Sequence, residues 1–190
     1  NIKRSLTILG VLLATNSFWL LPNLYTVAKQ GSVIRDSKIN QLFSPEAFLR
    51  NKEYGSLSDI VLHKNFLFSW REYSEESKEF VDLLDEWNKH LAKPKVELVG
   101  YLIASFSLLG IVITFVQREK IGLYLIPVIF ISLFFLINDN PPTGTIYTLL
   151  YSRNELFREA LRMPFTKFSI LFMFAAAFYL SLALNKLFSI

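Results

Sequence analysis

The chain is organised around one stretch, Gly144-Thr-Ile-Tyr-Thr-Leu-Leu-Tyr-Ser-Arg-Asn-Glu-Leu-Phe-Arg-Glu-Ala-Leu-Arg-Met-Pro-Phe-Thr-Lys-Phe168. This stretch lies between two long apolar runs, yet it carries Arg153, Arg158, Arg162 and Lys167. Its aromatic and aliphatic residues recur at helical spacing, which is typical of an amphipathic helix. A loop that only reversed the chain between two membrane spans could be far shorter. The stretch therefore predicts an interfacial amphipathic helix that leads directly into the last apolar run.

The cations of this stretch are candidates for contact with an anionic lipid headgroup. If residues 155–161 are helical, Arg158 and Arg162 lie four residues apart and project from one face. Lys167 follows at the membrane surface, where a lysine side chain can reach the headgroups. Arginine binds phosphate through two parallel hydrogen bonds, and lysine provides a point charge. We therefore expect Arg158, Arg162 and Lys167 to bind a lipid phosphate, with the alternative that these cations only anchor the helix among membrane phospholipids.

Four apolar runs predict an all-α membrane protein with about four transmembrane helices and a mainly helical outer loop. Hydrophobic residues make up 52% of the 190 residues and aromatic residues 15%, as in membrane proteins with aromatic interfaces. The expected segments are a first span (1–24), a long polar segment (25–95), a hairpin of two spans (96–137), the basic outer loop (138–167) and a last span (168–190). Asn16 lies inside the first span, and we expect its amide to face the helix bundle or an internal cavity.

The distribution of cations predicts the orientation of these spans. If all four runs cross the membrane, the cations of the short segments fall on one side, namely Lys3, Arg4, Arg118, Lys120 and Lys186. The positive-inside rule places that side in the cytoplasm. We therefore expect an integral, multi-pass protein of the cell membrane whose two long loops are extracytoplasmic.

The first long loop contains patterns that favour helices. Ser44-Pro45-Glu46 is typical of an N-cap followed by proline at the first helical position, and predicts a short helix to about Arg50. Residues 60–70 form a short apolar run that fits helix and strand equally. Ser74 then predicts the N-cap of a helix over about residues 75–91, whose apolar residues form one stripe. Because its other face is net acidic, we expect this helix to pack on protein and not on an anionic lipid surface.

Composition excludes several kinds of chemistry. The chain has no cysteine, so disulfides and thiolate catalysis are excluded. His63 and His90 are far apart and lack the spacing of metal ligands, so we predict no metal site and no cofactor. The net charge of +4 is small and dispersed, which predicts no nucleic-acid partner.

Asp139 is the second candidate for a functional residue. It follows the third apolar run within Asn138-Asp139-Asn140-Pro141-Pro142, at the predicted outer face. A carboxylate at the mouth of a membrane cavity could act as a general base, or could hold a metal ion or a sugar hydroxyl. Alternatively, Asp139 only caps the turn before the two prolines.

Two stretches resemble GT-C type membrane glycosyltransferases, and are nearest to the C-terminal part of the transmembrane region in arabinofuranosyltransferase-like proteins. Asn16-Ser-Phe-Trp-Leu-Leu-Pro22 is similar to the family's aromatic–aliphatic–proline ending of a span before a long outer loop. Gly144–Phe168 is similar to a glycine-containing loop, an amphipathic segment and an Arg-x-Pro-x-x-Lys-Phe entry into the next span. In this chain, that entry consists of Arg162, Pro164, Lys167 and Phe168.

The resemblance implies transfer of a sugar from a polyprenyl-phosphate donor at the outer membrane face of the cell envelope, with Arg162 and Lys167 as donor-phosphate or lipid contacts. The family's catalytic acidic residue usually lies in the first outer loop of the whole protein. We therefore expect this chain to be an internal or C-terminal piece of a longer polytopic chain, with that residue outside it. The alternative is a non-catalytic membrane scaffold or assembly subunit that binds a partner through its outer loop.

Overall fold

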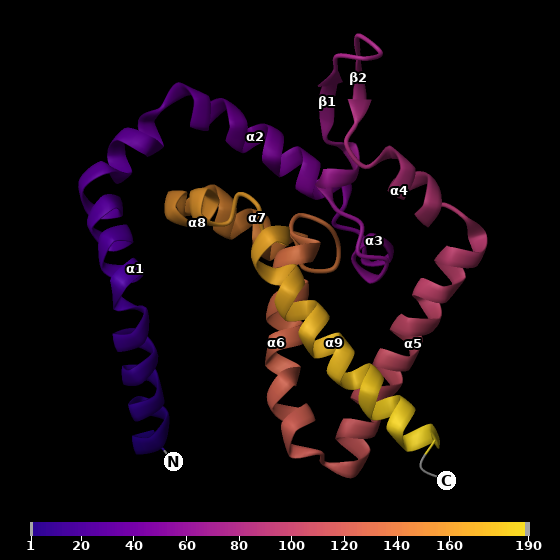
Figure 1. The fold of residues 1–190 in the computed structure, drawn as a ribbon. Helices are drawn as coiled ribbons and strands as arrows, with labels where there is room; N and C mark the ends of the chain where they lie inside the picture. Colours follow the sequence, from indigo (N-terminus) through magenta and orange to yellow (C-terminus); the bar gives the residue numbers. More distant parts are fainter. Residues whose placement is uncertain (1, 189–190) are drawn as a thin grey trace. The chain divides into compact units, whose positions relative to one another are not determined.

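A computed structural model describes residues 2–188, without the side chains of residues 34, 35, 39–44, 67, 69 and 156. The chain divides into two compact units, Asn1–Pro45 and Glu46–Ile190, which are described separately below. Most of the described chain is helical (Figure 1). Within residues 2–188, four helices are long and apolar enough to cross a membrane. The predicted all-α class and the four candidate spans are thus confirmed.

The first unit consists mainly of helix α1 (Ile2–Asp36). Asn16 satisfies its amide within this helix: its Nδ2 donates to the Leu12 carbonyl at 2.8 Å, and its Oδ1 accepts from Trp19 Nε1 at 2.8 Å. Both of these hydrogen bonds lie within α1 itself. The helix also continues past Pro22, where the sequence predicted that the first span ends. Proline removes only one backbone donor, and such a loss is tolerated in spanning helices.

Helix α2 (Lys38–Glu53) contains Pro45 in its interior. The prediction that Ser44 begins this helix is therefore wrong, because the residues before Pro45 are already helical. Two short helical segments follow, α3 (Leu57–Val61) and the 3-10 helix η1 (Phe66–Ser69). Ser56 caps α3 by accepting a hydrogen bond from the Asp59 backbone N–H at 3.2 Å.

The predicted helix over residues 75–91 is wrong over its first half. Strands β1 (Arg71–Ser74) and β2 (Glu79–Asp82) form an antiparallel hairpin, and only α4 (Asp85–Leu91) is helical. Tyr73 faces Phe80 across the hairpin with ring centroids 5.5 Å apart. The turn is closed by a hydrogen bond from the Lys78 N–H to the Ser74 carbonyl at 2.9 Å, with Lys78 in the left-handed region (φ 58°). Aromatic residues favour such a cross-strand pair, and this preference prevailed over the helical spacing.

The membrane-spanning part of the second unit is a bundle of α5 (Pro94–Gln117), α6 (Lys120–Ile137) and α9 (Phe165–Phe188). Ser107 contacts Ala176, and Gly110 approaches Tyr179 three residues further along both helices, so α5 and α9 run in parallel. Helix α6 follows α5 after a tight turn at Arg118 and runs in the opposite direction (Figure 1).

Small residues bring α5 and α9 into close contact. A Cβ atom added at Gly110 would lie 1.9 Å from the Tyr179 carbonyl oxygen. The Tyr179 hydroxyl donates to the Gly122 carbonyl at 2.8 Å and thereby also joins α9 to α6. Ala175 and Ala183, four residues to either side of Tyr179, are fully buried. Spacing of this kind lets two backbones approach each other in a membrane.

The organising stretch forms two helices instead of one, α7 (Gly144–Arg153) and α8 (Glu155–Ala160). Asn154 divides them, because its Oδ1 accepts from the Phe157 N–H at 2.9 Å and begins α8. The Tyr147 ring is almost fully buried and packs against Phe157 at 5.5 Å between centroids. Burial raises the pKa of Tyr147 to about 12. Tyr147 also lies 6.0 Å from Phe134 between ring centroids, so aromatic packing joins this stretch to the C-terminal end of α6.

Candidate functional site

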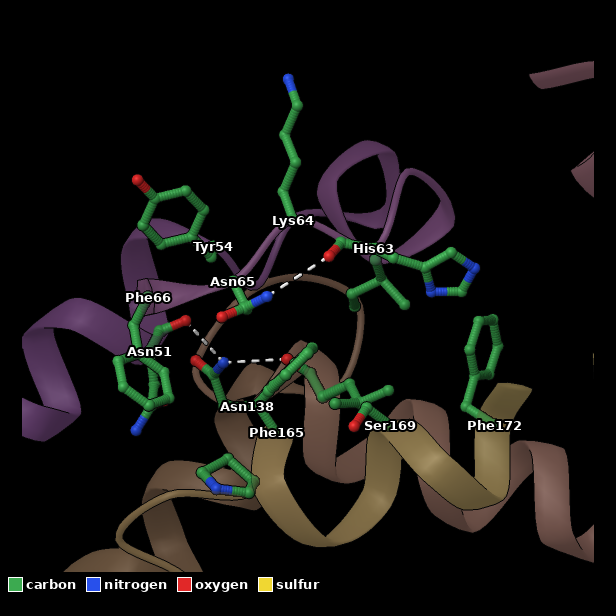
Figure 2. A pocket seen from close by; sticks show the side chains of 13 residues that line it. Asn51, Tyr54, His63, Lys64, Asn65, Phe66, Asn138, Phe165, Ser169 and Phe172 are labelled. Carbon is green, nitrogen blue, oxygen red and sulfur yellow. Dashed lines mark hydrogen bonds between the residues drawn. The ribbon is translucent and has the colours of Figure 1, made fainter. Parts of the chain in front are cut away.

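A polar pocket lies where residues 51–66 meet the C-terminal end of α6 and the N-terminal end of α9 (Figure 2). Its polar lining includes Asn51 from α2, His63 and Asn65 from the connection after α3, and Asn138 from the corner after α6. About 20 Å³ remains open to the centres of water-sized molecules, which is room for about one water. The pocket is thus mainly filled by protein, and its amide groups are committed to holding the elements together.

Asn138 is the centre of this arrangement. Only 2% of its surface is exposed, and its backbone (φ 49°, ψ −119°) has a conformation that glycine adopts most readily. Its Nδ2 donates to the carbonyls of Asn51 and Leu136, each at 2.9 Å, and its Oδ1 accepts from the Asp139 N–H at 2.6 Å. Asn51 Nδ2 in turn donates to the Arg162 carbonyl at 2.7 Å. These bonds fix α2, the end of α6 and the entry into α9 relative to one another.

Asp139 is held in one orientation by two donors. Lys52 Nζ lies 2.7 Å from its Oδ2, and the Thr148 hydroxyl donates to its Oδ1. Burial raises the pKa of Asp139, but the hydrogen bonds from Lys52 and Thr148 and the charge of Lys52 outweigh this effect, and the net pKa is lowered. A carboxylate with a lowered pKa is a weak general base and a good hydrogen-bond acceptor. Both oxygens of this carboxylate therefore already accept hydrogen bonds from within the protein.

The three predicted phosphate-binding cations do not form one cluster with Asp139. Arg158 Nε lies 3.2 Å from Glu159 Oε1, and Arg162 Nη1 lies 3.9 Å from Glu159 Oε2, so Glu159 bridges the two arginines. Arg158 also pairs with Glu155 at 3.4 Å. Lys167 is exposed in the first turn of α9. An anionic ligand would therefore share or displace these glutamates, which the reasoning from sequence did not weigh.

Sequence reasoning also missed an apolar groove that lies between α5, α6 and α9 and extends to α3. Its volume is about 520 Å³, within the usual range for small-molecule sites. Its lining is mostly apolar, with side chains such as Ile111, Leu133 and Ala176. No pattern in the sequence indicates such a groove, because it depends on the crossing of α5 and α9.

His63 and Phe172 line both the groove and the polar pocket. Their ring centroids lie 5.8 Å apart. Burial lowers the pKa of His63 below its usual value, which favours the neutral imidazole. The end of the groove beside α3 is therefore bordered by the titratable side chain of His63, which also lines the polar pocket.

Among the described residues, no three His, Asp or Glu side chains are placed to hold a metal ion together.

No protein-family model matches the chain, and no curated protein and no solved structure is significantly similar to it. The likeness to GT-C transferases therefore rests on the two quoted stretches alone.

Proposed function

We propose that this chain is part of an integral membrane glycosyltransferase that uses a polyprenyl-phosphate sugar donor at the outer membrane face, and that it holds the lipid part of that donor. The observation that carries the proposal is the apolar groove, whose end beside α3 is lined by the polar side chains of Ser58 and His63. A polyprenyl phosphate needs both kinds of surface, because its chain is apolar and its headgroup is charged. A groove within the spanning bundle would take the chain without removing it from the bilayer.

Each candidate residue then has a separate role. The groove packs the polyprenyl chain, and the Arg158–Arg162 pair with Lys167 attracts the phosphate from the membrane surface. Asp139, oriented by Lys52 and Thr148, accepts a hydrogen bond from a sugar hydroxyl. The catalytic base lies in another part of a longer chain.

Filling the groove tests this function. Ala176 lines the groove, whereas the adjacent Ala177 is exposed on another face of α9. Ala176→Trp should weaken binding of polyprenyl phosphate at least about tenfold, because a large ring occupies the space of the chain. Ala177→Trp is the matched control and should bind like the wild type. Binding is measured by native mass spectrometry of the chain in nanodiscs of zwitterionic phospholipid, which has no net charge. Equal binding of polyprenyl phosphate by both variants would contradict the proposal.

The headgroup contact needs its own variants. Arg162→Gln with Lys167→Gln should weaken binding of polyprenyl phosphate and leave binding of polyprenol, which lacks the phosphate, unchanged. Loss of both ligands to the same degree would instead indicate that these residues only support the fold.

One observation favours the alternative of a scaffold or assembly subunit. The hairpin and α4 expose Tyr73, Phe80 and Trp87, by 49%, 67% and 59% of their surfaces. Exposed aromatic side chains on neighbouring elements are typical of protein interfaces. A scaffold would bind polyprenyl phosphate no better than an ordinary phospholipid, so the nanodisc measurement also separates these two functions.

A further inference from the structure

We propose that the imidazole of His63 contacts the polar headgroup of the lipid whose chain lies in the groove. The inference rests on the proposed function, and it names a residue that sequence patterns did not single out. It stands on the position of His63 at the junction of the two cavities, on its constrained backbone and on the groups around it.

The backbone of His63 is held in one conformation. Its φ of 58° lies in the left-handed region, which a residue directly after a helix C-cap often adopts, as His63 does after Leu62 at the end of α3. Three hydrogen bonds hold this turn: the His63 N–H donates to the Ile60 carbonyl at 3.1 Å, the Lys64 N–H donates to the Asp59 carbonyl at 2.8 Å, and Asn65 Nδ2 donates to the His63 carbonyl at 3.4 Å. Such conformations persist where the surrounding structure fixes them, and they are frequent at ligand sites.

This conformation directs the ring towards the groove. Figure 2 shows the imidazole beside the Phe172 ring, on the opposite side of the pocket from Asn51 and Asn138. The Lys64 side chain points away from the pocket in the same view. The amide groups of Asn51 and Asn138 are occupied by backbone partners, so they do not compete for a headgroup.

Few other titratable groups surround His63. Tyr54 and Lys64 line the pocket and Tyr101 lines the groove, while α6 and α9 contribute no titratable side chain to either lining. The carboxylate of Asp59, on α3, accepts a hydrogen bond from Ser56. The neutral imidazole can donate one hydrogen bond to a phosphate oxygen. A bound phosphate also favours the protonated ring, so affinity should rise as the pH falls.

Two substitutions test this contact. Asparagine tolerates left-handed backbone, so His63→Asn keeps the turn while it removes the ring. His63→Gln keeps a polar group of similar length. Both should weaken binding of a polyprenyl phosphodiester about tenfold and leave binding of polyprenol unchanged. Between about pH 8 and about pH 6, the wild type should bind the phosphodiester more tightly as the pH falls, and neither variant should show this change.

The outcomes separate this inference from the proposed function. Equal loss of phosphodiester and polyprenol binding in His63→Asn would overturn the inference, because the residue would then only shape the groove. Unchanged binding in both His63 variants would also overturn it, and the proposed function would stand if Ala176→Trp still weakened binding. If Ala176→Trp had no effect either, the proposed function would fail as well.

Discussion

The second unit contains a segment before α5, residues 46–91, and its two halves differ in their contacts with the bundle. Residues 46–70 are tied to the bundle by Asn51 and Lys52, and Ile60 is buried against the end of α6. Residues 71–91 form a hairpin and a short helix whose large apolar side chains are mainly exposed. Both halves carry apolar residues at regular spacing, yet among the described side chains it is an amide of the first half, that of Asn51, that binds a backbone group beside the bundle, the Arg162 carbonyl.

This difference indicates what fixes the candidate site. Burial of apolar side chains stabilises the fold, but it does not require the contacting groups to take one particular orientation. A hydrogen bond from a buried amide does require one orientation of donor and acceptor, and breaking it leaves its partner without a bond. The amide network therefore fixes the end of α2 at the corner after α6, and the burial of Ile60 against Leu136 and Ile137 holds α3, and with it the turn that carries His63, beside the same corner.

The largest expected effect comes from Asn138. Asn138→Ala removes the bonds to Asn51 and to the Asp139 N–H and places alanine at a positive φ, so the free energy of unfolding should fall by about 3 kcal/mol. Unfolding in detergent micelles, followed by circular dichroism, measures this loss. Asn138→Gly is the control for the backbone, and should lose about 1 kcal/mol less because glycine adopts this φ without strain. A loss below about 1 kcal/mol for Asn138→Ala would show that the network does not hold the outer segment.

A smaller effect is expected from Asp139. At pH 7, Asp139→Asn should lower the free energy of unfolding by about 1 kcal/mol, since the exposed Lys52 ammonium is screened by water. The pKa of Asp139 is lowered in the folded chain, so its charge stabilises the fold above the pKa of the unfolded carboxyl, about 4. That stabilisation is lost as the pH falls through the lower folded value. The difference between wild type and variant should therefore shrink below about pH 4.

Asp82 provides the matched control in the other half. It pairs with Arg71 at 3.3 Å within the exposed hairpin. Asp82→Asn should leave the stability of the bundle unchanged at every pH. An equal loss for both variants would contradict the distinction between the two halves.

The spans of the bundle could be predicted closely from sequence, because length and hydropathy suffice to identify a membrane helix. The predicted hairpin of two spans, 96–137, agrees with the outer limits of α5 and α6, Pro94 and Ile137, to within two residues. The helical spacing of apolar residues gave a wrong prediction where one of these residues also fits a pair across two strands. Phe80 fits a helical stripe with Leu84 and Trp87, but it pairs with Tyr73 across a hairpin.

The candidate site was harder to predict, because its contacts join residues that are far apart in sequence. Lys52 and Asp139 are 87 residues apart, and nothing local indicates that they pair. The sequence singles out Asp139 before the two prolines, whereas its neighbour Asn138 is the residue that binds the backbone of α2. The sequence indicates the basic stretch, but it does not indicate that Glu155 and Glu159 within this stretch pair with Arg158.

The smallest expected effect on stability concerns residues 71–91, the half of the segment that forms the hairpin and α4. Phe80→Ser removes the ring that packs on Tyr73, and cross-strand pairs of this kind contribute about 0.5–1 kcal/mol to a hairpin. Hydrogen exchange at the backbone of residues 71–82 should become several-fold faster, while the unfolding midpoint of the bundle should not move. Ile60→Ala is the contrasting variant, because Ile60 is buried against Leu136 and Ile137, and it should lower that midpoint. If Phe80→Ser lowered the midpoint as much as Ile60→Ala, the hairpin would be part of the cooperative fold, and the amide network could not be what separates the two halves.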